Sequence, residues 1–266
     1  YVGGTSGLIY GYVNDGFYTV ADFESFDSKS RTWKLKEGVV DSSPLSDTPR
    51  PGNAKFKKLT PVDPNSTNPY QLTEADRTVI GNTTPKFSGG FGLNATYKGF
   101  DMSMFFNFMY DFDVLNANKI MLTTWADNKE NNFLMDIASD KRWRNFDDMG
   151  NEIRYSPEVL AEFNKNATMW NPTSIGRPIC MSYAVEDGSF LRLNSATLGY
   201  TLPSVWTKKV GLSKVRFYVS GNNLFTLTGY SGYDPEVNIA TGLTPNIDYD
   251  RYPRSRTYTF GAQLTF

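Results

Sequence analysis

The feature that most constrains the fold is an alternation of apolar and polar residues with a period of two. At the end of the chain, every second residue of TYTFGAQLTF is apolar, and the residues between them are Thr, Gly or Gln. The same period runs through residues 87–97 and 100–110, with Phe105 and Met109 as the exceptions. Successive side chains of a β-strand point to opposite faces, so each segment predicts a strand with one apolar and one polar face.

Two further segments continue the series of strands. Residues 189–202 follow the turn signal Asp187-Gly188, and in residues 214–227 Val215, Phe217 and Val219 alternate with Arg216, Tyr218 and Ser220. The sequence therefore predicts five strands. Segments of about eleven residues are long for a soluble sheet.

The connections between these strands alternate in length. Those at 98–99 and 203–213 are short, whereas those at 111–187 and 228–255 are long. A membrane β-barrel with tight turns on one side and large loops on the other has this pattern. We therefore expect an all-β fold, a transmembrane antiparallel β-barrel of which this chain supplies a part. The apolar face meets lipid and the polar face lines a wet interior.

Five strands are fewer than the ~8 of the smallest membrane barrel, and an open sheet edge in lipid leaves backbone amides unsatisfied. We therefore expect further strands from outside this sequence. The chain opens at Tyr1 with no initiator Met and no signal peptide, so we expect it to be processed, truncated or a fragment of a longer protein. The segment 21–84 is expected to be a long polar loop, and helical pieces are expected at 128–145 and 156–165.

Composition excludes several functions. The net charge of −1 gives no basic excess for binding nucleic acid. There is no His, so the commonest general base and zinc ligand is missing, and the single Cys180 excludes an internal disulfide. Aromatic residues make up 15% of the chain although its mean hydropathy is −0.43, which two-faced strands explain. We therefore expect that the protein is not an enzyme.

Several motifs, taken in their order along the chain, resemble one family. They are IYGYVNDGFY at 9–18, DRTVIGNTTPKFSGGF at 76–91, EDGSFLRLNSATLGYTLP at 186–203, VSGNNLFTLT at 219–228 and YSGYDPEV at 230–237. They are similar to segments that follow one another in the same order in the C-terminal third of SusC/RagA-type TonB-dependent outer-membrane transporters. The terminal YPRSRTYTFGAQLTF closes the match, which spans nearly the whole chain.

The resemblance implies a 22-stranded barrel with an N-terminal plug. Residues 1–266 would form the C-terminal part of that barrel, with its strands and long extracellular loops, and the plug and N-terminal strands would lie outside this chain. It also implies the outer membrane of a Gram-negative bacterium, with four partners: membrane lipid, the rest of the same transporter, TonB acting through the plug, and a SusD-like surface lipoprotein that forms a lid. The cargo would be oligosaccharides or oligopeptides, between which the sequence does not decide.

Family members often carry a calcium-like loop just before the DR segment. Here the residues at positions 1, 3, 5 and 12 of such a loop are Asp63, Asn65, Thr67 and Glu74. Asn68 replaces the turn glycine, and prolines intrude on both sides. An ordinary turn stabilised by Asp and Asn side chains is the alternative to bound calcium; no other cofactor is expected.

Aromatic and basic residues of the loops are candidates for contact with substrate. The loop tryptophans are Trp33, Trp125, Trp143 and Trp170, whose rings either stack on sugars or pack inside the loops. Arg177, Arg192 and Arg216 either contact substrate or pair with carboxylates of the wall. Trp143, Trp170 and Arg177 are retained as substrate-binding candidates. Asp234 and Glu236 resemble a catalytic pair, but no nucleophile accompanies them.

A different class of protein also fits short aromatic strands. A secreted soluble β-sandwich, such as a carbohydrate-binding module, would bury the apolar faces of residues 87–110 and 258–266 in a core. A barrel leaves those faces uncovered by protein. The exposure of these faces distinguishes the two folds.

Overall fold

The computed structural model describes residues 5–124, 132–138, 140–236, 246–249 and 252–266. The chain forms two compact units. The first, here called the sheet unit, comprises Tyr1–Gly7, Asn82–Val114 and Glu186–Phe266. The second, the loop unit, comprises Leu8–Gly81 and Leu115–Val185.

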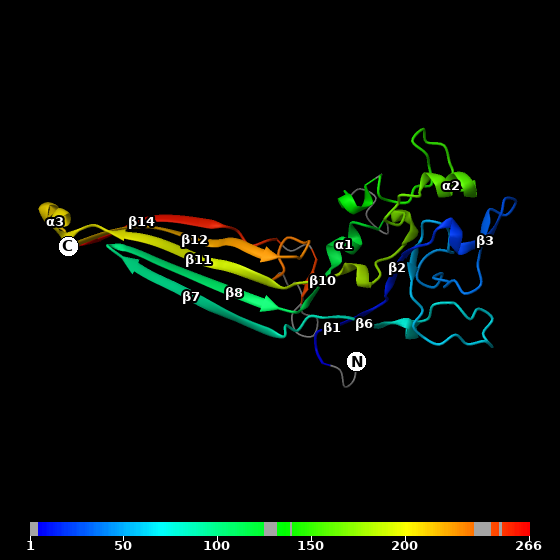
Figure 1. Ribbon diagram of the computed structural model, residues 1–266, viewed down its shortest axis with the longest axis horizontal. Coiled ribbons are helices and arrows are strands. Elements are labelled where there is room, and N and C mark those ends of the chain that lie inside the picture. Colours follow the sequence, from blue (N-terminus) through cyan, green and yellow to red (C-terminus); the bar gives the residue numbers. More distant parts are fainter. Residues whose placement is uncertain (1–4, 125–131, 139, 237–245, 250–251) are drawn as a thin grey trace. The chain divides into compact units, whose positions relative to one another are not determined.

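The sheet unit is built on a five-stranded antiparallel sheet in the order β14, β12, β11, β8, β7 (Figure 1). Its strands are β7 (Phe87–Tyr97), β8 (Phe100–Tyr110), β11 (Phe190–Thr201), β12 (Lys214–Thr228) and β14 (Thr257–Thr265). These are the five strands that the alternation predicts, so that prediction is confirmed.

The short connections have the geometry that their residues favour. Lys98 and Gly99 join β7 to β8 with φ angles of 45° and 88°, and a two-residue hairpin turn of this kind needs positive φ at both positions. A Cβ on Gly99 would lie 2.8 Å from the carbonyl oxygen of Thr201, so glycine is required there for space as well. The second connector holds α3 (Ser204–Thr207) and a 3-10 helix at Lys208–Val210.

The register of the sheet separates apolar from charged side chains. One row across it contains Leu93, Met104, Ala196, Gly221 and Tyr258, one residue from each strand. Neighbouring rows on this apolar face continue with phenylalanine, leucine, methionine, valine and tyrosine. A bulge between Leu193 and Ser195 shifts the alternation of β11 by one residue, which keeps the leucines on both sides of the bulge on the apolar face.

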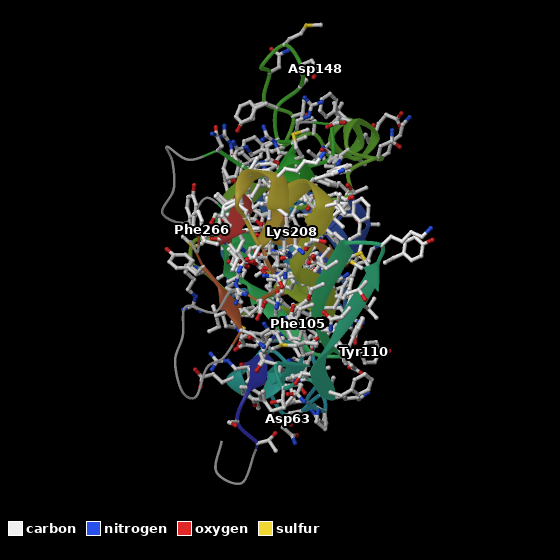
Figure 2. All side chains as sticks on the ribbon, turned by 90° about the vertical axis from the view of Figure 1, so that its left-hand side faces the viewer. Asp63, Phe105, Tyr110, Asp148, Lys208 and Phe266 are labelled. Atoms are coloured by element: carbon white, nitrogen blue, oxygen red, sulfur yellow. The ribbon has the colours of Figure 1, made fainter. Side chains whose placement is uncertain are left out.

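All charged residues of the five strands lie on the opposite, polar face. They are Asp101, Arg192, Lys214 and Arg216. Figure 2 labels Phe105 and Tyr110 of β8; their spacing of five residues places them on opposite faces. Phe105 lies on the polar face, where its ring reaches over Gly90 of β7; a Cβ on Gly90 would lie 2.9 Å from the ring, so this glycine gives the ring space.

The apolar face is open and as tall as a membrane. Phe91, Leu198, Phe217 and Phe260 remain 44%, 48%, 51% and 79% exposed. Eleven residues at ~3.3 Å each, tilted by about 45°, span about 26 Å, close to the ~25 Å apolar band of membrane barrels. A soluble β-sandwich buries such a face, so the exposure supports the barrel.

The loop unit consists of short elements. Its paired strands are β1 (Leu8–Gly11) with β6 (Thr78–Asn82), β2 (Asn14–Phe17) with β5 (Ala54–Phe56), and β3 (Phe23–Asp27) with β4 (Thr32–Leu35). Its helices are α1 (Ala117–Met121) and α2 (Pro157–Phe163), with 3-10 helices at Val20–Asp22, Glu74–Asp76, Met135–Ile137, Pro172–Ser174 and Ser182–Ala184. Three short strands that do not belong to the loop unit alone, β9 (Asp113–Asn116), β10 (Val185–Asp187) and β13 (Ile247–Asp248), form a separate sheet. No helix among the described residues is long and apolar enough to cross a membrane.

The long connections are folded rather than irregular. Phe56, Leu72, Trp170 and Met181 are almost completely buried in one shared core, although the segment 21–84 is expected to be a loop. The sequence pattern misses this core because its members come from segments that are far apart in the chain and show no periodicity.

Of the two predicted helices in this unit, one is confirmed. α2 lies within 156–165, as expected. The described part of 128–145 holds only the 3-10 helix at Met135–Ile137, so the prediction of a helix there is wrong. Arg142 forms a β-bridge with Met169, and the Trp143 amide donates to the Met169 carbonyl at 2.8 Å, which holds this segment extended.

Candidate functional site

The polar face of the sheet carries a bidentate ion pair. Arg216 of β12 donates from Nε to Asp101 Oδ1 at 2.9 Å and from Nη2 to Oδ2 at 2.5 Å. The guanidinium crosses β11 at Gly199, where a Cβ would lie 2.4 Å from Nη2. Gly199 therefore gives Arg216 the space to reach Asp101, and the pair becomes part of the wall.

A second group of charges joins the loop after β12 to the sheet. Arg192 of β11 is 1% exposed; it pairs with Asp234 and, at 3.3 Å, with Glu236. Glu236 also pairs with Arg254 at 3.2 Å. Asp234 Oδ1 accepts from the Glu236 amide at 2.9 Å, which shapes the turn. Both carboxylates are therefore engaged by arginines, and this explains the YDPEV segment without any catalytic role.

The candidate tryptophans are packed inside the loop unit. Trp143 is 3% exposed and fills the space above Gly52, where a Cβ would lie 2.2 Å from its ring. Trp170 is 2% exposed, donates from Nε1 to the Thr123 carbonyl at 3.2 Å and contacts Tyr183 edge-on. Trp33 contacts Phe26, and Trp125 lies outside the described residues. As folded, the Trp143 and Trp170 rings face neighbouring side chains; stacking on a ligand stays a prediction.

The calcium candidates form a turn. Asp63 Oδ1 accepts a hydrogen bond from the Asn65 amide at 2.9 Å, and the Asp63 carbonyl accepts from the Ser66 amide at 3.1 Å. The side chains from Asp63 to Thr67 are exposed, and Glu74 begins a 3-10 helix. Within the described ranges, no group of three or more Asp, Glu, Cys or His side chains is placed to hold a metal ion. Calcium binding stays a prediction.

Asp76, the first residue of the DRTVIGN motif, fixes the segment beside this turn. Its fully buried carboxylate accepts from the amides of Leu59, Thr60 and Thr73 at 2.7–2.9 Å and from the hydroxyls of both threonines. Burial by itself would raise the pKa of this carboxyl, but the hydrogen bonds, those from Thr60 foremost, outweigh it and hold the pKa far below its usual range. Asp76 is therefore an anionic anchor, and it positions the next residue, Arg77.

Arg77 and Arg177 line the same hollow of the loop unit, whose volume is about 480 Å³. The Arg77 guanidinium lies 5.3 Å from the Tyr12 ring centroid, and Arg177 Nη2 donates to the Pro44 carbonyl at 2.9 Å. Tyr10 and Glu74 also line the hollow. Two cations, hydroxyls and one carboxylate can bind polar groups of a ligand.

The structure therefore separates the three substrate-binding candidates. Arg177 lies at the hollow, whereas Trp143 and Trp170 belong to two different cores. The Asp76-Arg77 pair within the DRTVIGN motif is the sequence signal that could have identified Arg77.

The architecture defines the class of this protein. One face of the sheet is open, uncharged and as tall as a membrane, and all charges of the strands lie on the other face. Such a sheet is part of the wall of a transmembrane β-barrel.

No model of a protein family matches the chain. TonB-dependent receptor P3 of Formosa agariphila is 33% identical over 266 residues, covering 98% of this chain and 22% of the relative. TonB-dependent receptor SusC of Bacteroides thetaiotaomicron is 36% identical over 88 residues, covering 32% of this chain and 8% of the relative.

Solved structures agree in fold. A structure of the RagAB peptide transporter superimposes with a TM-score of 0.60 at 22% identity, covering 99% of this chain and 23% of that one. The structure of the RagAB peptide importer in the closed-closed state superimposes with a TM-score of 0.56, covering 97% of this chain and 23% of that one. The chain belongs to the TonB-dependent receptors, and it is similar to SusC in part of its sequence and to RagAB in fold. It spans about a fifth of the length of the relatives it matches.

Proposed function

We propose that this chain supplies part of the wall and several outer loops of a TonB-dependent importer in the outer membrane of a Gram-negative bacterium. The observation that carries the proposal is the separation of side chains by face. Every charged residue of the five strands lies on one face, and the other face is apolar and open. Lipid solvates the apolar face, and the polar face borders a wet lumen.

The cargo class follows from the family. Members import oligosaccharides or oligopeptides that are too large for porins, and the hollow with Arg77 and Arg177 offers groups that bind either class. The chain makes no covalent change to its cargo. Its wall carboxylates are engaged by arginines, as Asp101 is by Arg216, which agrees with a role in transport rather than catalysis.

Completion of the barrel requires other strands. We assign residues 1–266 to the C-terminal part of the barrel, with the plug and the N-terminal strands supplied by the rest of the same protein. The edges of β7 and β14 support this, because an unpaired strand in lipid leaves its amides unsatisfied. Energy would enter through TonB acting on the plug.

A surface lipoprotein of the SusD type would cap the barrel as a lid. The loop unit supports this partner, since it presents folded elements with their own cores rather than mobile connections. Such a preformed surface suits docking at low entropic cost. The secreted β-sandwich is disfavoured, because Phe217 and Phe260 of the apolar face are uncovered.

The test is purification of the full-length receptor in detergent, followed by mass spectrometry of the intact complex. We expect the whole transporter to co-purify with a lipoprotein, together with any bound glycan or peptide. A full-length receptor that stays monodisperse without detergent and carries no lipoprotein would contradict the importer.

A further inference from the structure

A second, smaller hollow in the loop unit is lined mainly by polar and basic side chains. Its volume is about 70 Å³, and its lining includes Arg31, Arg50, Arg154, Trp33 and Tyr155. It shares no lining residue with the larger hollow that contains Arg77 and Arg177. The functions proposed above for the sheet and for the lipoprotein lid assign no role to this hollow.

The cations of this hollow are incompletely neutralised. The Arg31 and Arg154 guanidiniums lie 4.8 Å and 5.7 Å from the centroid of the same Tyr155 ring. Arg154 pairs with Glu152 at 2.5 Å, but Arg31 and Arg50 form no ion pair in the part of the chain that the structure describes. Asp47 is the single carboxylate of the lining, against three arginines. Like charges held together favour a bound anion.

A buried hydroxyl supplies a hydrogen-bond donor to the same space. Ser174 lines the hollow and is 3% exposed. Its Oγ accepts from the Ala54 amide at 3.3 Å, and none of the described residues accepts its hydroxyl hydrogen. Guanidiniums together with a hydroxyl donor form the set that binds carboxylate or sulfate oxygens.

The size of the hollow limits what it holds. A volume of about 70 Å³ is well below the ~300–1,000 Å³ of pockets that enclose a small-molecule ligand, so the hollow takes one substituent of a ligand and not the whole of it. The rest of a ligand therefore lies outside. The lining adds Asn53, Asn145 and Asn171, whose amides suit sugar hydroxyls, and it has few aliphatic side chains to hold a peptide.

We propose that this hollow binds the anionic substituent of an acidic oligosaccharide. The proposal rests on the importer function and names its class of substrate: a saccharide that carries carboxylate or sulfate groups. Arg31 and Arg50 supply the charge, Ser174 supplies a hydrogen bond, and Trp33 and Tyr155 provide aromatic surface beside the group.

The test uses the full-length receptor in detergent and isothermal titration calorimetry with four probes. These are tetragalacturonate, a sulfated galactan tetrasaccharide, neutral maltotetraose and a tetraglutamate peptide. We expect one of the two acidic saccharides to bind, and Arg31→Gln with Arg50→Gln to weaken it at least ~10-fold. Which of the two binds distinguishes carboxylate from sulfate. Lys29→Gln with Lys36→Gln, which removes equal charge from exposed positions outside the hollow, should change little.

Four results would overturn the proposal: equal affinity in the Arg31 and Arg50 double variant, equal binding of maltotetraose, binding of tetraglutamate alone, or no binding of either acidic saccharide. Thermal unfolding of each variant checks that the fold is kept, which we expect because both arginines are exposed. Co-purification of the lipoprotein tests the importer function separately. A receptor that keeps its lipoprotein but binds no acidic saccharide would sink only the proposal for this hollow.

Discussion

A charge placed on either side of one strand tests the orientation of the sheet. Met104 and Ser103 are adjacent on β8, at the same height but on opposite faces. We consider Met104→Arg and Ser103→Arg in the full-length receptor. Met104 lies between Leu93 and Ala196 in the central row of the apolar face, whereas Ser103 lies between Asn94 and Thr197.

The size of the effect follows from depth. Met104 is four residues from one end of β8 and six from the other, which at ~3.3 Å per residue and a tilt of about 45° is roughly 9–14 Å from either end. It therefore lies near the bilayer midplane, where an arginine on the lipid face costs about 2–4 kcal/mol. An arginine at Ser103 enters the wet lumen and should cost less than about 1 kcal/mol. Tyr97→Arg, at the strand end, should cost ~0–1 kcal/mol.

The assay is denaturant unfolding of the receptor in lipid vesicles, monitored by tryptophan fluorescence. A barrel predicts a large loss for Met104→Arg and small losses for the two other variants. A buried core in a soluble sandwich would make Tyr97→Arg and Met104→Arg comparable, because burial there does not depend on depth. Equal losses for Met104→Arg and Ser103→Arg would refute the assignment of the two faces.

The other predictions concern packing, buried charge and pH. Gly90→Ala should destabilise the receptor by ~1–3 kcal/mol, because the new Cβ would lie 2.9 Å from the Phe106 carbonyl oxygen. Gly92→Ala should be tolerated, because its Cβ would lie 3.6 Å from the Met104 carbonyl oxygen. The denaturant midpoints of unfolding of the two variants distinguish these outcomes. Arg192→Leu should cost about 3–5 kcal/mol by leaving Asp234 buried and unpaired, and adding Asp234→Leu should recover part of this loss in a double-mutant cycle. Asp76 has a lowered folded pKa, so its stabilisation is present above its unfolded pKa of ~3.9 and is lost as pH falls through its folded pKa. Thermal unfolding measured as the pH falls below about 4 should therefore show a fall in stability that Asp76→Asn lacks.

Several features of this protein follow from the sequence alone. A period of two over eleven residues fixes which side chains share a face, since strand geometry leaves no other arrangement. The five strands and the positive-φ turn at Lys98-Gly99 were therefore predictable, and so was the placement of Asp101 and Arg216 on the polar face. The order of the motifs along the chain also identified the family before any geometry was known.

Other features depend on contacts that no local pattern encodes. The bulge after Leu193 is set by register with two neighbouring strands, and the path of Arg216 across Gly199 appears only when β8, β11 and β12 are aligned. The core of the loop unit joins Phe56 to Trp170, which are far apart in sequence and lie in segments without periodicity.

The candidate site shows the same division. Arg177 was recognisable as a loop arginine, but its neighbour Arg77 is positioned by the buried Asp76, whose partners are brought together by folding. Trp143 is an aromatic loop residue in the sequence, and its burial against Gly52 is a property of the fold. The sequence by itself determined the strands, their two faces and the family, because these depend on neighbours along the chain. Only the tertiary structure decided which loop side chains are buried and which line a hollow, because burial depends on distant segments that pack together.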